Sequence, residues 1–307
     1  MIFFLKRLLL FVVFAIPVYL VSVLLWGWRF PQSFKPNIKY VKGGYGYTFS
    51  RLKEIKQLDK GVDILFLGSS HAYRGFDPRN FPGMKTFNLG SNSQTPIQTD
   101  LLLQRYLDKV TPKMIIYEVF PNGFCIDGVE SALDIISNDK NDIGSVIMAF
   151  KINDIPTYNT LIYSSWCEAL HLYNSFSEPV RKQKFNDTYI RGGYVEKDLQ
   201  QFSDTCCEPA KQWEFRREQI KAFEKTVTRI KTKKIELVLV YAPVTSSFYH
   251  SYINNQAFDS LMNTYNVSYY NFNELMHLND SLDFYDKHHL NRDGVAAFNK
   301  ELKHHLK

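Results

Sequence analysis

The sequence predicts an α/β protein in which a five-stranded parallel sheet is covered by helices on both faces, a three-layer αβα sandwich. Two observations carry this expectation. Short, almost continuous apolar runs bounded by glycine or proline alternate with longer amphipathic stretches, which is the pattern of βαβ units. The chain has 307 residues, of which 45% are hydrophobic and 22% charged, so it can bury the core that such a sheet needs.

The five expected strands are short and apolar. The first is the clearest, because Gly61 and Gly68 bound a run with a single charged residue. The strands are expected at 62–67, 85–89, 114–120, 236–241 and 267–272. Helices are expected between them at 97–110, 210–231 and 253–265. Because parallel strands end at one edge of a sheet, the residues that follow these strands are expected to meet there.

An uncharged apolar run near the N-terminus predicts a membrane anchor. It covers residues 8–26, about 19 residues, which at roughly 1.5 Å per residue is long enough to cross a bilayer. Lys6 and Arg7 precede the run, and bulky aromatic residues follow it, so we expect an uncleaved anchor rather than a signal peptide. The basic residues after the run outnumber those before it, so charge does not fix the orientation. The very short leader favours a C-terminal domain outside the cytoplasm, on the periplasmic or cell-surface side.

The chain divides into an anchor, a tether and one folded domain. Residues 1–30 are expected to form the anchor, and 31–60 a juxtamembrane tether that ends in a short helix. Residues 61–307 form the α/β domain, in which the strand and helix alternation lapses at about 123–209. This aromatic-rich helical insertion is either a cap over the site or a set of surface helices with its own small core.

Composition gives no case for nucleic acid as a partner. The formal net charge is +6, and the basic residues are scattered apart from one short run at 231–234, at an expected helix end. The number of cysteines is even, so an oxidising compartment could pair them in more than one way, and free thiols stay equally open. They are Cys125, Cys167, Cys206 and Cys207.

Two short segments supply the three groups of a serine nucleophile site. Residues 68–71 read Gly-Ser-Ser-His after the first strand, and residues 286–294 read Asp-Lys-His-His-Leu-Asn-Arg-Asp-Gly. A serine hydroxyl is a weak nucleophile until a base takes its proton, and the base needs an acceptor that fixes its tautomer. We therefore expect Ser70 to be the nucleophile, His289 the general base, and Asp286 the carboxylate that orients the base.

Three donors are expected to stabilise the oxyanion that such an attack creates. They are the backbone N–H groups of Ser70 and Gly90 and the side-chain amide of Asn122, each of which follows an expected strand. Gly90 lacks a Cβ and would let a substrate approach the backbone. Glycine after a strand is also an ordinary turn residue, so both interpretations stay open for it.

Neighbouring residues offer alternatives for these roles. His288 is an alternative base and Asp283 an alternative carboxylate, although the Leu-Asn-x-x-Gly register favours the first pair. His71 follows the nucleophile and is expected to pack or to contact substrate, without a catalytic role. Arg74 is expected to form a surface ion pair, and contact with an anionic substrate is the other interpretation.

These motifs resemble the SGNH (GDSL-like) hydrolase superfamily. Its first block, Gly-Asp-Ser, is similar to residues 68–70, its second-block glycine to Gly90, and its last block to 286–294. The third block, Gly-x-Asn-Asp, is matched only by Asn122 within 120–123. The resemblance covers about residues 62–307 and implies a flavodoxin-like SGNH fold.

The anchor and the Gly-Ser-Ser variant of the first block resemble the membrane-anchored branch of this superfamily. That branch includes the lipoteichoic acid D-alanyl transfer protein and alginate-type O-acetylation proteins. The resemblance implies an O-acyl esterase or O-acyltransferase that acts on a cell-envelope polysaccharide or teichoic-type polymer. It implies no cofactor and no metal. The implied partners are the bilayer, the acylated polymer and a membrane-bound acyltransferase.

Two other functions fit the same residues. The protein could be a non-catalytic assembly factor that uses the cleft only to hold polymer, because a complete triad in sequence still has to be assembled in space. It could also be a metallohydrolase, because histidine and carboxylate side chains gather in the same segments. The ligands in that case would be Asp283, Asp286, His288, His289 and His71.

Overall fold

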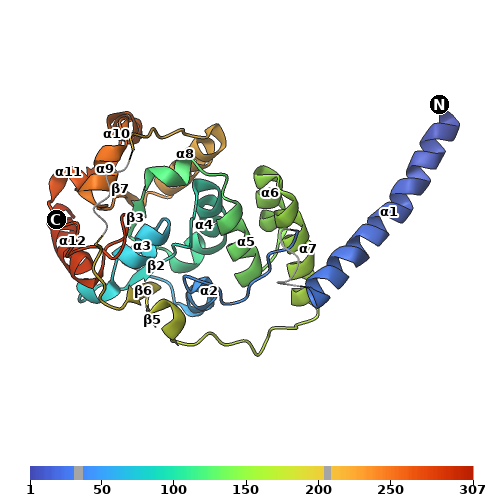
Figure 1. The fold of residues 1–307 in the computed structure, drawn as a ribbon, viewed down its shortest axis with the longest axis horizontal. Helices are drawn as coiled ribbons and strands as arrows, with labels where there is room; N and C mark the ends of the chain where they lie inside the picture. The colour runs from blue at the N-terminus through green and yellow to red at the C-terminus, as the bar shows by residue number, and fades with distance from the viewer. Residues whose placement is uncertain (31–36, 204–208, 307) are drawn as a thin grey trace.

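The computed structural model describes residues 1–30, 37–203 and 209–306 and contains the expected parallel sheet (Figure 1). Its strands are β1 (Ile64–Leu67), β2 (Thr86–Asn88), β3 (Met114–Glu118), β7 (Glu236–Tyr241) and β8 (Ser268–Asn271). Their order is β2-β1-β3-β7-β8, and every neighbouring pair is parallel. Each strand lies within the range that the apolar runs predict, so the five-stranded parallel sheet is confirmed.

The strand order creates a switch point between β1 and β3. The chain leaves β1 to form β2 on one side and then crosses to the other side to form β3. Leu67, the last residue of β1, pairs with Tyr117, so the two strands end side by side. Ligands of open parallel sheets bind beyond the carboxyl ends of the strands at such a point. The sheet thus places the segments after β1 and β3 next to each other.

Both faces of the sheet are buried against helices. Along β1, Leu65 and Leu67 belong to one core cluster and Ile64 and Phe66 to the other, because successive side chains of a strand point to opposite faces. The first face is covered by α4 (Pro96–Val110) and α8 (Arg217–Thr232), and the second by α3 (Ser70–Gly75) and α12 (Arg292–His305). The shorter helices are α9 (Ser246–Ser251), α10 (Asn255–Asn263), α11 (Phe272–Leu275) and three 3-10 turns, η1 (Pro78–Asn80), η2 (Pro121–Phe124) and η3 (Gln183–Phe185).

The insertion contains three helices, as the sequence predicts for a helical segment, and a small antiparallel sheet that the sequence did not predict. The helices are α5 (Val129–Asn138), α6 (Ile143–Ile152) and α7 (Ile155–Ala169), and the antiparallel strands are β4 (Arg181–Lys182), β5 (Asp187–Ile190) and β6 (Tyr194–Lys197). Ile135, Ile136 and Met148 join the core cluster of the first sheet face. Helices α5 and α6 therefore extend the main core, whereas Tyr163 and Cys167 of α7 form a small separate cluster with α1, and β6 lies against α3.

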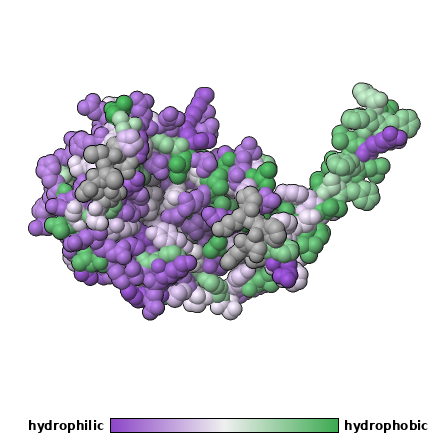
Figure 2. All heavy atoms as spheres, in the orientation of Figure 1, coloured by the Kyte–Doolittle hydropathy of each residue, from purple (hydrophilic) through white to green (hydrophobic). Residues whose placement is uncertain are grey.

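The N-terminal helix α1 (Ile2–Arg29) has 28 residues and is long and apolar enough to cross a membrane. Figure 1 shows it projecting from the rest of the protein, with the N-terminus at its far tip. Its surface is almost entirely apolar, whereas polar residues dominate the visible face of the domain (Figure 2). Length and composition therefore agree with the expected anchor.

The folded body begins earlier than the expected boundary at residue 61. Helix α2 (Thr48–Gln57) buries Leu52 and Ile55 in the main core, and Tyr47 before it is fully buried. Residues 52 and 55 share one face of the helix, and this spacing is what docks the segment. Of the expected tether, residues 31–36 lie outside the described residues.

The structure shows the state of two of the four cysteines. Cys125 and Cys167 both carry free thiols, the first half-buried and the second buried. Cys206 and Cys207 lie outside the described residues. Burial raises the pKa of Cys125 to about 11, so its thiol is protonated at neutral pH and is not a reactive nucleophile.

Candidate active site

The turn after β1 presents Ser70 at the edge of the sheet. Gly68 has a φ of +134°, and a Cβ there would lie 2.8 Å from the Cβ and the carbonyl oxygen of Glu118. Only glycine fits this close approach and this backbone conformation. The chain can therefore turn directly from β1 into α3, whose first residue is Ser70. Ser70 is only partly buried, so a substrate can reach its hydroxyl.

The structure brings the three residues of the predicted triad together. Nε2 of His289 lies 2.8 Å from Oγ of Ser70, across 219 positions of sequence. Nδ1 of His289 lies 2.9 Å from Oδ2 of Asp286. Oδ1 of Asp286 accepts the backbone N–H groups of His288 at 3.0 Å and His289 at 2.8 Å, which fixes the carboxylate in its loop. A carboxylate bound at Nδ1 leaves the lone pair of Nε2 directed at the hydroxyl, as proton abstraction requires.

The protonation states of His289 and Asp286 suit a general base. Burial lowers the pKa of His289 below its ordinary value of 6.5, although Asp286 acts in the opposite direction. Burial alone would raise the pKa of Asp286, but the hydrogen bond from His289 and the nearby imidazoles lower it below its usual range. At neutral pH the site therefore holds a neutral imidazole beside an ionised carboxylate, which is the state that accepts a proton from serine.

The pH dependence of Ser70 labelling follows from this state. The rate constant for labelling by a fluorophosphonate is expected to be level at neutral pH and to fall only below pH 6.5, the ordinary pKa of histidine. Below the pKa of His289 the rate should fall about tenfold per pH unit, because only the neutral imidazole is a base. Circular dichroism at each pH controls for unfolding. An inflection above pH 7 in a folded protein would contradict the assignment of His289.

The alternative base His288 and the alternative carboxylate Asp283 make other contacts than the triad pair. Nδ1 of His288 lies 3.9 Å from Oδ1 of Asp286 and has no hydrogen-bond partner in the described part of the chain. Burial and His289 lower the pKa of His288 to about 4. Oδ2 of Asp283 accepts the backbone N–H of Asn279 at 2.7 Å and so closes a turn. The geometry favours His289 and Asp286, as the motif register does.

The Leu-Asn-x-x-Gly register has a physical basis in the loop that carries His289. Oδ1 of Asn291 accepts the N–H groups of Asp293 at 3.0 Å and Gly294 at 3.1 Å and caps α12. The amide of Asn291 donates to the carbonyl of Leu282 at 2.6 Å. A Cβ on Gly294 would lie 2.1 Å from the carbonyl oxygen of Asp283, so only glycine fits. These contacts tie the loop to the start of α12.

The N–H of Gly90, expected to stabilise an oxyanion, already makes a structural hydrogen bond. Its N–H donates to Oδ1 of Asn88 at 3.0 Å, and Nδ2 of Asn88 donates to the carbonyl of Ala72 at 2.6 Å. A Cβ on Gly90 would lie 2.9 Å from the carbonyl oxygen of Ser69. The absence of a side chain at Gly90 therefore leaves room for the turn that carries Ser70. To donate to an oxyanion, the N–H of Gly90 would have to break or share its hydrogen bond to Oδ1 of Asn88.

The other two expected donors are not engaged. Asn122 lies in η2, directly after β3, and is partly buried. Within the described residues its side-chain amide has no hydrogen-bond partner, and the N–H of Ser70 has none either. Both follow the strands β1 and β3 that flank the switch point. They therefore have free N–H groups at this edge of the sheet.

Three polar side chains form a group behind the nucleophile, and the sequence predicts a role for only one of them, His71, which is expected to pack or to contact substrate. Oγ of Ser69 lies 3.1 Å from Nδ1 of His71 and donates to Oε2 of Glu118 at 3.3 Å. The ring of His71 stacks on His289, with 4.7 Å between the ring centroids. His71 therefore packs against the base and supports its orientation. The signal that could have found this group is Glu118, the one charged residue in an apolar strand.

The charge of Glu118 predicts how stability depends on pH. Burial raises its pKa to about 8 from the 4.5 of a free glutamate, and hydrogen bonds from Ser69 offset part of the shift. Between pH 4.5 and 8 the folded state binds more protons than the unfolded state, so this group makes the protein less stable as pH rises. Glu118→Gln should remove that decline. In thermal melts, its Tm relative to wild type should increase from pH 4.5 to pH 8, and a constant difference would contradict the raised pKa.

Arg74 forms a buried ion pair, so the expectation of a surface pair is wrong. Its guanidinium binds Asp187 of β5 in a bidentate manner, at 3.0 and 2.8 Å. The two side chains are 2% and 1% exposed, because the unpredicted hairpin covers α3. Arg74 also donates to the hydroxyl of Tyr45 at 2.9 Å. This pair locks the hairpin onto the helix that begins with Ser70.

Three histidines of the alternative metal-ligand set lie together. One nitrogen from each of His71, His288 and His289 lies within 4.8 Å of the others. Two nitrogens on one Zn²⁺ are at most about 4.2 Å apart, and their lone pairs must converge. The rings of His71 and His289 are stacked at 20°, so their in-plane lone pairs run side by side. Nε2 of His289 is also engaged by Ser70. This arrangement favours a serine site over a metal site.

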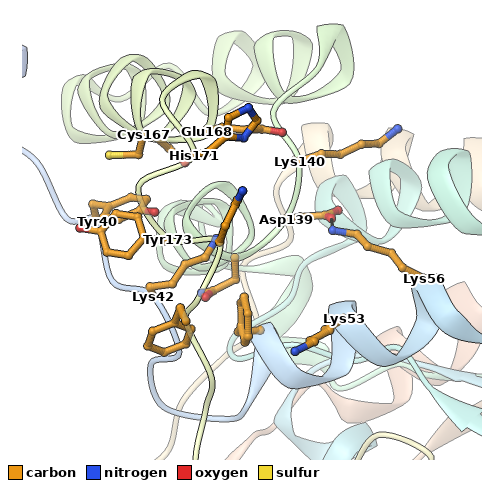
Figure 3. A pocket seen from close by; sticks show the side chains of 15 residues that line it. Tyr40, Lys42, Lys53, Lys56, Asp139, Lys140, Cys167, Glu168, His171 and Tyr173 are labelled. Atoms are coloured by element: carbon orange, nitrogen blue, oxygen red, sulfur yellow. Dashed lines mark ion pairs between the residues drawn. The ribbon is translucent and has the colours of Figure 1, made fainter.

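The surface beside the triad is only slightly hollowed. A cavity of about 10 Å³ touches His71, Arg74 and His289. A cavity of about 440 Å³ lies elsewhere, and no triad residue lines it. Figure 3 shows Lys53 and Lys56 reaching toward this second cavity from α2, opposite Tyr40 and Tyr173. A substrate therefore has to approach Ser70 from an open surface.

Comparison with known proteins adds no family assignment to this geometry. No protein-family model matches the chain, and no curated protein matches it. The likeness to SGNH hydrolases therefore rests on the motifs of this chain. Its reaction, substrate and partners have to be argued from the site.

Proposed function

We propose that this protein is a membrane-anchored serine acyl-transfer enzyme of the SGNH type, acting on an O-acylated polymer of the cell envelope. One observation carries the proposal, the 2.8 Å contact between Oγ of Ser70 and Nε2 of His289. Asp286 on the other ring nitrogen completes the set. Helices on both faces of a switch-point parallel sheet support the finer description of a three-layer αβα sandwich with a flavodoxin-like SGNH fold.

The geometry suits a two-step reaction. Nε2 of His289 takes the proton of Ser70 while Oγ attacks the carbonyl carbon of an ester. The N–H of Ser70 and the amide of Asn122 stabilise the oxyanion, and Gly90 joins them if its bond to Asn88 opens. Collapse breaks the ester bond, and the leaving alcohol takes the proton from His289. Water or a second hydroxyl, giving its proton to His289, then attacks the acyl-serine; the bond to Oγ breaks, His289 returns the proton to Ser70, and a carboxylic acid or a new ester is released.

The surroundings of the triad support a polymeric substrate. The hollow beside His289 holds only about 10 Å³ among the described residues, too little to enclose a small molecule, whereas a long chain can pass across such a surface. The apolar helix α1 supports attachment to a membrane. An acylated envelope glycan or teichoic-type polymer outside the cytoplasm fits both features. In a transfer reaction, a membrane-bound acyltransferase would supply the acyl group.

An assay of ester turnover tests this proposal. The full-length protein in detergent micelles is incubated with O-acetylated cell-wall glycan, and released acetate and acetyl transfer to an added sugar alcohol are measured. Wild type and Ser281→Ala should be equally active, because Ser281 is an exposed serine whose side chain makes no hydrogen bond in the described residues. Ser70→Ala should be inactive. Glycan binding by wild type without any ester cleavage would favour the non-catalytic alternative, to which the engaged N–H of Gly90 also points.

A further inference from the structure

Helix α6 is apolar on both of its faces. Its inner face buries Met148 and Ala149 in the main core. On its outer face Ile143, Ile147 and Phe150 are 74%, 52% and 68% exposed, at the spacing of one helical stripe. A helix that is apolar all round is normally covered on every side, and a contiguous exposed apolar patch marks an interaction surface. The outer face of α6 therefore needs a partner.

The neighbouring helix α7 packs along the C-terminal part of α1. The hydroxyl of Tyr19 donates to Oδ1 of Asn159, and Val23 is buried in a cluster with Tyr163. At Gly27 a Cβ would lie 2.3 Å from the Tyr163 ring, so glycine lets the ring lie flat on the helix. Residues 19, 23 and 27 form one stripe of α1. Figure 1 shows α6 and α7 on the side of the domain from which α1 projects.

The length of α1 relates this contact to the membrane. The uncharged residues before the contact, 8–18, extend only roughly 16 Å, which is about half of a hydrocarbon core of about 30 Å. The helix begins at Ile2, and residues 2–21 extend about 30 Å, with Lys6 and Arg7 near enough to the far surface for their long side chains to reach it. A span of this length ends beside Tyr19, where α7 contacts α1. The part of α7 that lies beside Tyr19 then sits at the level of the lipid headgroups.

We propose that the outer face of α6, together with the start of α7, is a second membrane contact that inserts into the interface of the same bilayer. Ile155, the first residue of α7, is 63% exposed and follows the end of α6 by three residues. Lys140 and Lys151 stand at the two ends of α6; they pair with Asp142 and Asp100, but their side chains are 53% and 40% exposed and long enough to extend to a headgroup layer. The proposal rests on α1 crossing a membrane and is independent of the reaction at Ser70.

This contact fixes how the domain stands on the bilayer. The packing of α7 on α1 sets the angle between the domain and its anchor, but a single spanning helix can still tilt within the bilayer. A second contact through α6, joined to α1 through α7, holds one face of the domain down. Figure 1 shows α3, which begins with Ser70, on the far side of α4 and α5 from α1. The triad is then held at a fixed height, away from the lipid and open to a polymer.

Photo-crosslinking of the full-length protein tests the contact and names the occupant. A benzophenone amino acid replaces Ile147, and the protein is reconstituted in vesicles of phosphatidylethanolamine and phosphatidylglycerol. The control carries the same amino acid at Ile253, which is 65% exposed in the loop before α10, away from α1. After irradiation, mass spectrometry should find lipid adducts at position 147 at a yield several times higher than at 253. The same variants are also irradiated in cell membranes.

Each outcome has a distinct meaning. Equal lipid yields at 147 and 253 would overturn the proposal. A protein adduct at 147 in cell membranes, or a cross-linked dimer in vesicles, would overturn it in favour of a partner protein or a second copy. Alkaline carbonate extraction of the wild type separates the two claims. A chain that resists extraction but gives no lipid adduct at 147 leaves the anchor standing and rejects only the second contact, whereas an extracted chain rejects both.

Discussion

Turnover of an activated acetyl ester is expected to fall by roughly 10⁴-fold or more when Ser70 is replaced by alanine, because the acyl-enzyme cannot form. His289→Ala is expected to cause a loss of similar size, since Oγ of Ser70 has no other base within hydrogen-bonding distance in the described residues. Initial rates with p-nitrophenyl acetate, measured on the full-length protein in detergent, give both values.

The double variant provides the sharper result. If Ser70 and His289 act as one unit, the variant Ser70→Ala with His289→Ala should be no slower than either single variant. Independent contributions would instead multiply. Far-UV circular dichroism of all three variants controls for folding. A folded Ser70→Ala protein that keeps wild-type turnover would reject the nucleophile, and multiplicative losses would reject the coupling.

Breaking the buried ion pair between Arg74 and Asp187 is expected to destabilise the protein by about 3–5 kcal/mol. Removing one partner leaves the other charge buried, since the side chains are 2% and 1% exposed, and Asp187 then keeps, among the described residues, only the more distant Nζ of Lys197 at 3.8 Å. Urea unfolding of Arg74→Ala and Asp187→Asn measures the loss. Because the pair also holds the hairpin on α3, ester turnover at Ser70 should decrease in both variants while they remain folded.

A neighbouring arginine supplies the matched control. Arg79 pairs with Asp77 and Glu196, but its side chain is 49% exposed, so Arg79→Ala should cost only about 0–1 kcal/mol. Replacing both partners of the buried pair with apolar residues, Arg74→Met with Asp187→Leu, should cost less than the two single losses together. Equal costs for Arg74→Ala and Arg79→Ala would show that burial does not set the energy of these pairs.

Most of the sheet could be predicted because its strands are buried on both faces. Such strands are continuous apolar runs, and the 236–241 run coincides with β7 residue for residue. The hairpin of β5 and β6 could not be found in this way, because its strands are partly exposed and polar. Its signal was Gly192-Gly193, where both φ angles are positive, in the three-residue loop 191–193 between the paired residues Ile190 and Tyr194.

The triad could be predicted because each of its two segments is a local motif whose glycine or capping residue is required by the backbone conformation. Gly68 and Gly294 have no space for a Cβ, and Asn291 caps α12, so these residues fix the two loops independently of each other. Contacts between segments that are far apart in the sequence have no comparable local motif. The pairing of Arg74 with Asp187 depends on where the hairpin folds back, and nothing in the local sequence around either residue encodes that.

The most direct test of the central claim is the position of a covalent adduct. Full-length protein is treated with a fluorophosphonate, digested and mapped by mass spectrometry, with Ser69→Ala and His289→Ala as companions. The adduct is expected on Ser70 in wild type and in Ser69→Ala, and to be lost in His289→Ala. An adduct on Ser69, or labelling of a folded His289→Ala protein at the wild-type rate, would contradict the assignment of Ser70 as a nucleophile activated by His289.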